Sequence, residues 1–411
     1  METTEVIPDL VLEHPDDFER IGEKVTDQLD VVPAKYFIKR TVRPVFRRSD
    51  ARHLPPVVAP APATPLVGGL PSVALLALLL VAKYIDHLPL YRQQGIFLRA
   101  GLGIPRDLII HWIHKAIGLL LPVVEAIWEE VRASDYLQVD ETTVRYLKPG
   151  TGKSWIAYLW QVRRPGAGVF YHWGVGRSRA ELEECLGRHF RGHVQCDAYK
   201  VYESYVRSHP EVKLIACLAH IRRGFTDSLK SGPCRDAALI IHMMRQLYRI
   251  ESELRKKKAC PAMRHNVRAW QSAPLVRRIG RFMRVMLPKH RPSSLTGKAL
   301  AHALRHWEKL ERYLEDGRFE IDNNEVENGM RPVKLGMKNW LFFGSEDAGH
   351  HAAAIYTLVE NCKLHDLPVE AYLRQLLTVL PGVTDPEVIA SLTPARIAAA
   401  RRNKPARDDA A

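Results

Sequence analysis

The spacing of apolar residues between positions 136 and 217 restricts the fold more than any other feature of this sequence. Five runs there have period-two patterning and are rich in β-branched and aromatic residues, which is typical of strands. These runs are Tyr136–Val144, Trp155–Val162, Gly168–Val175, Gly192–Cys196 and Val212–Cys217. Because short connections join the first three runs, we expect them to form an antiparallel meander.

Helical segments separate the last three runs, at Ser178–Phe190 and Tyr199–Ser208. Ser178 is a candidate N-cap, with Glu181 three residues further on. Three antiparallel strands followed by helix, strand, helix and strand is the order of a ribonuclease H-like core, which contains a mixed five-stranded sheet. The sequence therefore predicts an α/β fold of this class.

A basic helical region interrupts the α/β pattern. We predict a catalytic core made of residues 133–217 and 317–365, with a helical insertion at 218–316. The insertion carries charge clusters at Arg255–Lys258, Arg277–Arg281 and Lys289–Arg291, interleaved with Trp270, Phe282 and Trp307. A basic run is usually a solvated face, but interleaved aromatic residues favour contact with nucleic acid.

The regions outside this core differ in composition. We expect a degenerate or truncated N-terminal module at 1–54, a proline-rich linker at 55–69, a helical domain at 70–132, and a C-terminal helix and tail at 366–411. Helices at Leu70–Tyr84, Leu90–Ala100 and Arg106–Leu121 with a glycine-containing turn predict a helix-turn-helix-like DNA-binding domain, in which Arg106 and Lys115 contact DNA. A plain helical bundle is the alternative.

Charge favours a polyanionic partner. The chain has 60 lysine and arginine residues against 46 acidic residues, a formal net charge of +14, which points to nucleic acid before membrane. The six cysteines are scattered without a CxxC pair, so neither a zinc ribbon nor a disulfide framework is indicated. The most apolar run, Val73–Ala82, is too short to span a bilayer. We expect an intracellular protein that does not contact a membrane.

The segment Ile321–Gly344 combines a carboxylate with several cations. A helix starting near Asp322 would have Asp322 as N-cap and Glu325 as the partner of a capping box. Side chains four, three and four residues apart then share one face of the helix. They are Glu327, Arg331, Lys334 and Lys338. Such a face suits a helix that meets both a metal ion and a polyanion, whereas the ordinary alternative is a solvated helix with ion pairs.

Two further carboxylates belong to neighbouring strands. Asp140 lies in the first strand and Asp197 directly follows the fourth. Taken singly, Asp197 could cap a helix and Asp140 could be a polar side chain on an exposed sheet face. Together with Glu327 they predict a hard-oxygen site for Mg²⁺ or Mn²⁺, with two ions for in-line phosphoryl displacement.

Several motifs together carry a family resemblance. They are LQVDETTV around Asp140, GHVQCDAYKVY around Asp197, CLAHIRRGF from Cys217, and DNNEVENGMRPVKLGMKNWLFFGS around Glu327. In these segments the chain resembles DDE-type transposases of the insertion sequence 66 family. The resemblance implies that Asp140, Asp197 and Glu327 are the catalytic triad and metal ligands.

The resemblance also implies DNA contacts and supporting groups. Arg331 and Lys338 would contact the phosphate backbone of the transposon end, with Lys334, Arg222 and Arg223 as further DNA-binding candidates. His220, Asn323 and Asn324 are candidates for active-site support. The pair Cys217 and His220 is half of a zinc site; local packing is the favoured interpretation, and support from His220 the second.

The chain departs from the family near its N-terminus. Relatives usually carry a cysteine-rich zinc module before the proline linker, whereas Arg43–Leu54 has no cysteine, so we do not expect zinc there. The sequence predicts a DNA transposase of the bacterial cytosol and nucleoid. The resemblance implies that it acts as a homodimer or higher oligomer, with accessory proteins of the same element as further candidate partners. A ribonuclease H-like nuclease without strand joining, and a non-catalytic DNA-binding protein derived from a transposase, are the alternatives.

Overall fold

The computed structural model describes residues 5, 7–13, 15–25, 35–50, 53, 55–61, 64–66, 69–197 and 199–403. The chain divides into two compact units, Met1–Ala59 and Pro60–Ala411. The first unit contains a short helix, α1 (Asp9–Glu13), a 3-10 turn, η1 (Pro15–Asp17), and a small antiparallel pair of strands. In that pair, β1 (Val45–Phe46) is matched with β2 (Val57–Val58).

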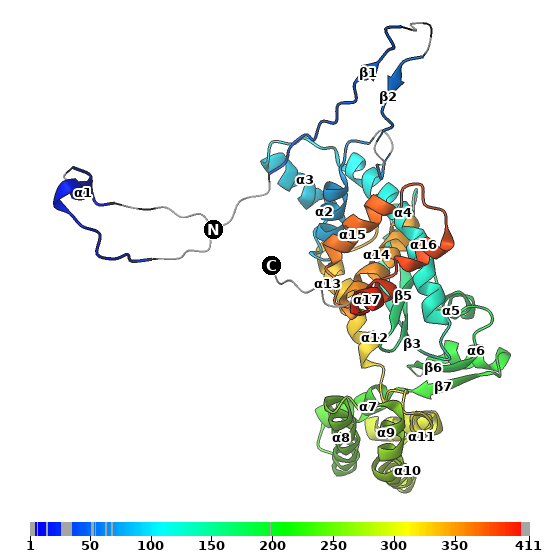
Figure 1. Ribbon diagram of the computed structural model, residues 1–411. Coiled ribbons are helices and arrows are strands. Elements are labelled where there is room, and N and C mark those ends of the chain that lie inside the picture. The colour runs from blue at the N-terminus through cyan, green and yellow to red at the C-terminus, as the bar shows by residue number, and fades with distance from the viewer. Residues whose placement is uncertain are drawn as a thin grey trace. The chain divides into compact units, whose positions relative to one another are not determined.

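The second unit is built on a mixed sheet of five strands in the order β5-β4-β3-β6-β7 (Figure 1). The strands are β3 (Tyr136–Leu147), β4 (Ser154–Arg164), β5 (Gly168–Gly174), β6 (Gly192–Cys196) and β7 (Val212–Ala216). β3, β4 and β5 form an antiparallel meander, whereas β6 pairs in parallel with both β3 and β7. The predicted five-stranded α/β arrangement is therefore confirmed, and it is consistent with a ribonuclease H-like core.

The strands form here because their apolar runs can be covered on both sides. The first four residues of β3 are all buried, which is the pattern of a strand with packed layers on both faces of the sheet. The crossovers are α5 (Arg179–Leu186) and α6 (Lys200–Ser208). Ser178 caps α5 as predicted, since its hydroxyl accepts a hydrogen bond from the backbone N–H of Glu181 at 3.3 Å.

Helices from both ends of this unit pack together. Those before the sheet are α2 (Val73–Tyr84), α3 (Leu90–Arg99) and α4 (Arg106–Arg132); those after it are α14 (Glu346–Leu364), α15 (Val369–Val379), α16 (Pro386–Ser391) and α17 (Pro394–Arg402). α4 and α14 both pack against β5, and α2 packs against α15. The three predicted N-terminal helices exist, but their role as a helix-turn-helix DNA-binding domain stays a prediction.

α4 is longer than the sequence suggested. The predicted helix ends at Leu121, yet α4 continues through Pro122 to Arg132. Beyond the proline its apolar side is fully covered, with Val123, Ile127 and Val131 buried, and this packing offsets the hydrogen bond that proline removes. α4 alone among the described helices is long and apolar enough to cross a membrane; here it is a core helix of the second unit.

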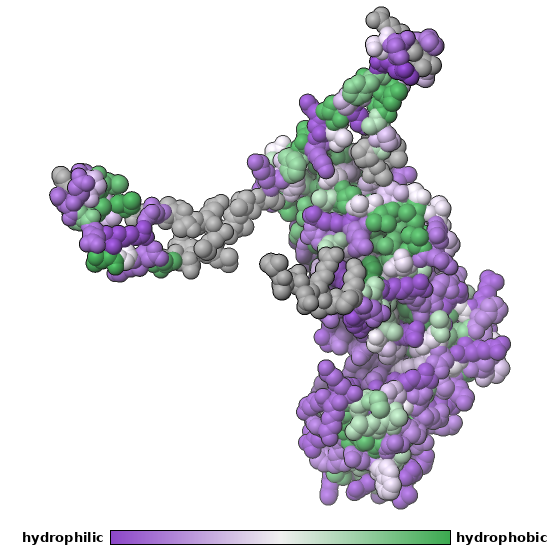
Figure 2. Space-filling view, in the orientation of Figure 1, coloured by the Kyte–Doolittle hydropathy of each residue, from purple (hydrophilic) through white to green (hydrophobic). Residues whose placement is uncertain are grey.

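Residues 218–314 are helical and form a group at the lower end of the view (Figure 1). The elements are α7 (Leu218–Ser231), α8 (Arg235–Lys256), α9 (Pro261–Val267), a π-helical turn (Arg268–Ser272), α10 (Ala273–Met286), η3 (Leu287–Lys289), α11 (Leu295–Glu311) and η4 (Arg312–Leu314). They share one core, to which Phe225, Met283 and Trp307 belong. Their outer surface is largely hydrophilic (Figure 2).

A fully buried ion pair lies inside this helical group. Arg268, on the π-helical turn, donates two hydrogen bonds of 2.8 Å to the Glu251 carboxylate on α8. Both side chains are 0% exposed. Arg268 also donates to the backbone carbonyls of Tyr313 and Asp316, so that one side chain joins α8, the π turn and the segment that returns to the sheet.

Candidate active site

The segment that returns from the helical group is fastened to the sheet at several points. Leu218, where the helical group begins, donates a backbone hydrogen bond of 3.1 Å to Ile321, where the chain returns from that group. The buried Gln195 side chain donates to the Glu320 carbonyl at 2.8 Å, and buried Gln138 donates to the Asp322 carbonyl at 3.2 Å. These bonds tie the returning chain to the middle of the sheet, where β3 and β6 lie side by side.

Asn323 continues this attachment on β3. Its side-chain amide, which is fully buried, donates to the Val139 carbonyl at 3.0 Å. Its backbone N–H is bonded to the Cys217 sulfur at 3.2 Å. The pairing of β3 with β6 ends at Gln138, so Asn323 takes up the next carbonyl of β3, directly before Asp140. The predicted supporting role of Asn323 therefore has a structural basis in positioning.

The predicted capping box is wrong. The helix α12 (Asn324–Gly329) begins two residues later than expected, with Asn323 as the residue before it. Asp322 instead folds into a local turn, in which its carboxylate accepts from the backbone N–H and the side chain of Asn324. Glu325 bonds Arg163 of β4 at 3.0 Å and does not reach back, because the preceding residues are already held by the sheet.

α12 and the following helix α13 (Arg331–Trp340) lie beside the part of β3 beyond Gln138, which β6 does not pair. Lys334 donates to the Thr143 carbonyl at 2.8 Å. Past α13, Phe343 exchanges backbone hydrogen bonds with Arg145 and Leu147 at 2.8 and 2.9 Å. Contacts at Val139, Thr143 and Leu147 thus fix this helical segment at intervals along one strand, and with it the position of Glu327.

Gly329 permits the close approach. A Cβ at this position would lie 2.2 Å from the Gln161 side chain on β4. The Tyr171 hydroxyl, from β5, donates to the Gly329 carbonyl at 2.6 Å. Any larger residue would push α12, and the carboxylate of Glu327 on it, away from the sheet.

Asp140 is the most strongly perturbed carboxyl of this site. Its pKa is raised to about 7, first by burial and then by the negative charges of Glu141, Asp197 and Glu327. Its carboxylate accepts a hydrogen bond from the backbone N–H of Glu141 at 2.9 Å. The negative charges of Asp197, at the end of β6, and of Glu327, on α12, both act on Asp140 of β3; that the three carboxylates form one catalytic site stays a prediction.

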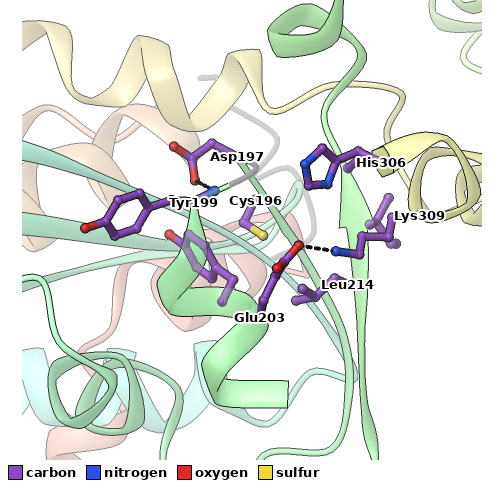
Figure 3. A pocket seen from close by; sticks show the side chains of 10 residues that line it. Cys196, Asp197, Tyr199, Glu203, Leu214, His306 and Lys309 are labelled. Atoms are coloured by element: carbon purple, nitrogen blue, oxygen red, sulfur yellow. Dashed lines mark hydrogen bonds and ion pairs between the residues drawn. The ribbon is translucent and has the colours of Figure 1, made fainter. Parts of the chain in front are cut away.

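Asp197 follows the last residue of β6, next to a cavity of about 10 Å³ (Figure 3). Its carboxylate accepts a hydrogen bond from the backbone N–H of Tyr199 at 3.0 Å. This bond forms a turn that precedes α6, and α6 itself, which begins at Lys200, has no side-chain cap. On the other side of the cavity an ion pair of 2.7 Å between Glu203 and Lys309 joins α6 to α11. The helical group is thereby anchored beside Asp197.

Sequence reasoning missed a cluster around Glu141. The Glu141 side chain is 1% exposed and pairs closely with Arg177, from the segment between β5 and α5. It also accepts a hydrogen bond of 2.7 Å from the Tyr202 hydroxyl. Arg177 reaches the Asp197 carboxylate at 3.4 Å and lies over the Tyr199 ring. Glu141 could have been found from the sequence, because it is a second acidic residue next to Asp140 in a strand that is covered on both faces. No local pattern indicated Arg177.

Glu327 faces the start of α7. One carboxylate oxygen lies 3.5 Å from His220 Nδ1 and the other 3.6 Å from the Arg223 guanidinium. The first oxygen is buried and has no hydrogen-bond partner among the described residues. Burial lowers the pKa of His220, against the opposing effect of Glu327, so the imidazole is neutral at neutral pH.

Cys217, His220 and Glu327 also form a group whose ligand atoms all lie within 4.8 Å of one another. Burial raises the pKa of the Cys217 thiol to about 12. The thiol is therefore protonated, and its sulfur accepts the Asn323 hydrogen bond. This contact fits the favoured interpretation of Cys217 as a packing residue.

The remaining predicted DNA contacts are dispersed. Arg331 and Lys338 are exposed, and their side chains have no ion pair or hydrogen bond with any residue that the structure describes. Arg222 is partly buried and lies over the Tyr248 ring. Arg106 and Lys115 are exposed on α4, where Lys115 lines a groove of about 930 Å³. These two are not among the groups that surround the three carboxylates.

Comparison with known proteins decides the family. The model of the IS66 transposase family matches residues 68–351, a range that includes every predicted site residue. The chain belongs to the IS66 family of transposases. Two uncharacterised proteins of Sinorhizobium fredii are similar: y4qI is 37% identical over 87% of this chain and 68% of its own length, and y4jD is 32% identical over 91% and 75%.

Membership of the IS66 family sets the broad chemistry. Transposases of this kind bind DNA and use divalent metal ions. The match begins before α2 and ends within α14, so it covers the whole sheet and the helical group at 218–314. The positions of Asp140, Asp197 and Glu327 all lie within the matched range.

Proposed function

We propose that this IS66-family transposase cleaves DNA at transposon ends and joins the resulting 3′-hydroxyl to target DNA. Asp140, Asp197 and Glu327 act as the catalytic and metal-binding residues in this proposal. The observation that carries it is the raised pKa of Asp140, which arises from burial and from negative charge that includes both other carboxylates. The attachment of Asn323 to Val139, directly before Asp140, supports the same grouping, because it holds the start of α12 and hence Glu327 beside β3.

The residues present suit divalent ions such as Mg²⁺ or Mn²⁺. Carboxylate oxygens are the ligands these hard cations prefer. Among the described residues, Glu327 has a buried oxygen without a hydrogen-bond partner, and the Asp140 carboxylate accepts one hydrogen bond, from the backbone N–H of Glu141. Free carboxylate oxygens near one another are costly when buried, and a bound cation would remove that cost.

When bound, two divalent ions would activate the attacking oxygen and neutralise charge on the scissile phosphate. Asp140 must give up its proton before it can ligate, and a pKa of about 7 places that step near neutral pH. Arg177 holds Glu141 and approaches Asp197, which keeps both carboxylates oriented. Asn323 positions β3 at Val139, directly before Asp140.

DNA would reach the site along α13. Arg331 and Lys338 are exposed and unpaired among the described side chains, as expected of groups that bind phosphates. Lys334 donates to both the carbonyl and the hydroxyl of Thr143, at 2.8 and 3.4 Å, so it holds α13 to the sheet and keeps at least one of its three donors for DNA. Arg223 lies between Glu327 and solvent. Two bound ends imply an assembly of at least two copies, in the bacterial cytosol.

A strand-transfer assay tests the proposal. The full chain is incubated with Mg²⁺ and labelled duplexes that carry the inverted-repeat ends of its own element, and both nicked and joined products are measured. We expect Asp140→Asn, Asp197→Asn and Glu327→Gln to abolish both products. Glu325→Gln, on the same helix but paired with Arg163, is the matched control and should stay active.

Each other outcome has a defined meaning. Nicking without joined product would indicate a nuclease on the same fold. Binding of ends without metal-dependent nicking would indicate a non-catalytic DNA-binding protein. Wild-type levels of cleavage in Asp140→Asn would refute the assignment of the site.

A further inference from the structure

A second group of potential metal ligands lies outside the carboxylate site. His172 is on β5, and Glu181 and Glu184 are one turn apart on α5. His172 Nε2 lies 3.0 Å from a Glu181 carboxylate oxygen and 3.6 Å from one of Glu184. One ligand atom from each of the three residues lies within 4.8 Å of the others.

These separations suit a small tetrahedral ion. Ligands about 2.0–2.1 Å from zinc lie about 3.3–3.4 Å from each other in a tetrahedron. The observed separations, 3.0 and 3.6 Å, lie on either side of that value. A hydrogen bond accounts for the His172–Glu181 contact, but 3.6 Å is too long for one to Glu184.

The backbone is shaped to admit the Glu181 carboxylate. A Cβ on Gly174, at the end of β5, would lie 2.3 Å from the nearer Glu181 oxygen. The side chains of His172 and Glu181 are 14% and 16% exposed, whereas that of Glu184 is 69% exposed. The group is therefore mostly enclosed, with one ligand at the surface where an ion can enter.

The ligand atoms indicate which ions would fit, since His172 offers a nitrogen and Glu181 and Glu184 offer carboxylate oxygens. Mixed nitrogen and carboxylate ligands select transition metals over Mg²⁺.

We propose that His172, Glu181 and Glu184 bind a divalent transition metal ion of the zinc type, with water in the fourth position. The site would join β5 to α5 across the connecting residues 175–178. That connection carries Arg177, which contacts Glu141 and Asp197. A bound ion would thus restrain the residue that holds two carboxylates of the candidate active site. The proposal is independent of the catalytic activity proposed above.

Zinc titration of the full chain in excess Mg²⁺ tests this site, because Mg²⁺ occupies hard carboxylate ligands and leaves the mixed site open. Binding is followed by competition with a chromophoric zinc chelator. We expect one zinc ion per chain, and a loss of affinity of at least about tenfold in Glu184→Gln and in His172→Asn. Glu183→Gln is the matched control on the same helix, since Glu183 pairs with Arg179.

Hydrogen exchange provides a second readout that needs no activity. Zinc should slow exchange in peptides that cover residues 172–184 in the wild type and in Glu183→Gln, but not in Glu184→Gln. Glu184 is mostly exposed, so its substitution is not expected to unfold the chain. The proposal is overturned if the wild type does not bind zinc, or if Glu184→Gln and Glu183→Gln bind zinc with equal affinity. It is also overturned if Glu327→Gln loses binding instead, because that result would place the ion at Cys217 and His220.

Discussion

Asp140→Asn should stabilise the metal-free protein at alkaline pH, although it removes a residue proposed to be catalytic. The pKa of Asp140 is raised from an ordinary 3.8 to about 7. Between these values the folded chain keeps a proton that the unfolded chain has lost, so stability falls as pH rises through this window and is level above it. One pKa unit corresponds to about 1.4 kcal/mol. The raised pKa of Asp140 therefore lowers the free energy of unfolding of the wild type by about 4 kcal/mol at pH 8 and by about 1.5 kcal/mol at pH 5.

The difference between these two costs, about 2.5 kcal/mol, is the quantity to measure. It is independent of how well the new amide fits, because that contribution is the same at both pH values. Urea unfolding of wild type and Asp140→Asn is followed in EDTA at pH 5 and pH 8. The free energy of unfolding of Asp140→Asn, relative to that of the wild type, should be about 2.5 kcal/mol higher at pH 8 than at pH 5. Addition of Mg²⁺ at pH 8 should stabilise the wild type more than the variant. A stability gap that is equal at both pH values, or that shrinks at pH 8, would refute the argument that Asp140 is buried among other carboxylates.

Two further predictions concern the helical group and the DNA contacts. Arg268→Met leaves the buried Glu251 carboxylate unpaired and should cost about 3–5 kcal/mol in urea unfolding, with most of the loss recovered in Arg268→Met/Glu251→Leu; no recovery in the double variant would contradict this explanation. Lys338→Ala should weaken binding to all DNA sequences alike and lower the slope of log affinity against log salt by about one. Lys230→Ala, in which the lost lysine is exposed and paired with Asp227, is the control and should leave that slope unchanged.

The sequence predicted the sheet well because each strand has its own local signal. β6 matches its predicted bounds, and β3, β4, β5 and β7 differ by a few residues at their ends. The predicted single helix after Asp322 was harder, because the structure has two helices there, α12 and α13, and the start of α12 depends on distant groups. Asn323 is held by Val139 and Cys217, and that long-range attachment overrides the local preference of Asp322 for an N-cap position. Tertiary packing likewise carries α4 past Pro122.

Residues of the candidate site with a local sequence signal could be predicted, and those without one could not. Asp140 was singled out by its place in the first strand, Asp197 by its place directly after the fourth, and Glu327 by its place in a predicted helix. Arg177 has no such signal, since only the fold brings the segment between β5 and α5 next to Glu141.

The attachment of α12 and α13 to β3 explains how a helical group of nearly one hundred residues can stand between Asp197 and Glu327 in the chain. The two ends of that group, at Leu218 and Ile321, are already hydrogen-bonded to each other. Residues after Ile321 are fixed by Val139, Thr143 and Leu147. The position of Glu327 is therefore set by β3 itself, and the inserted helices are free to serve a separate purpose without displacing it.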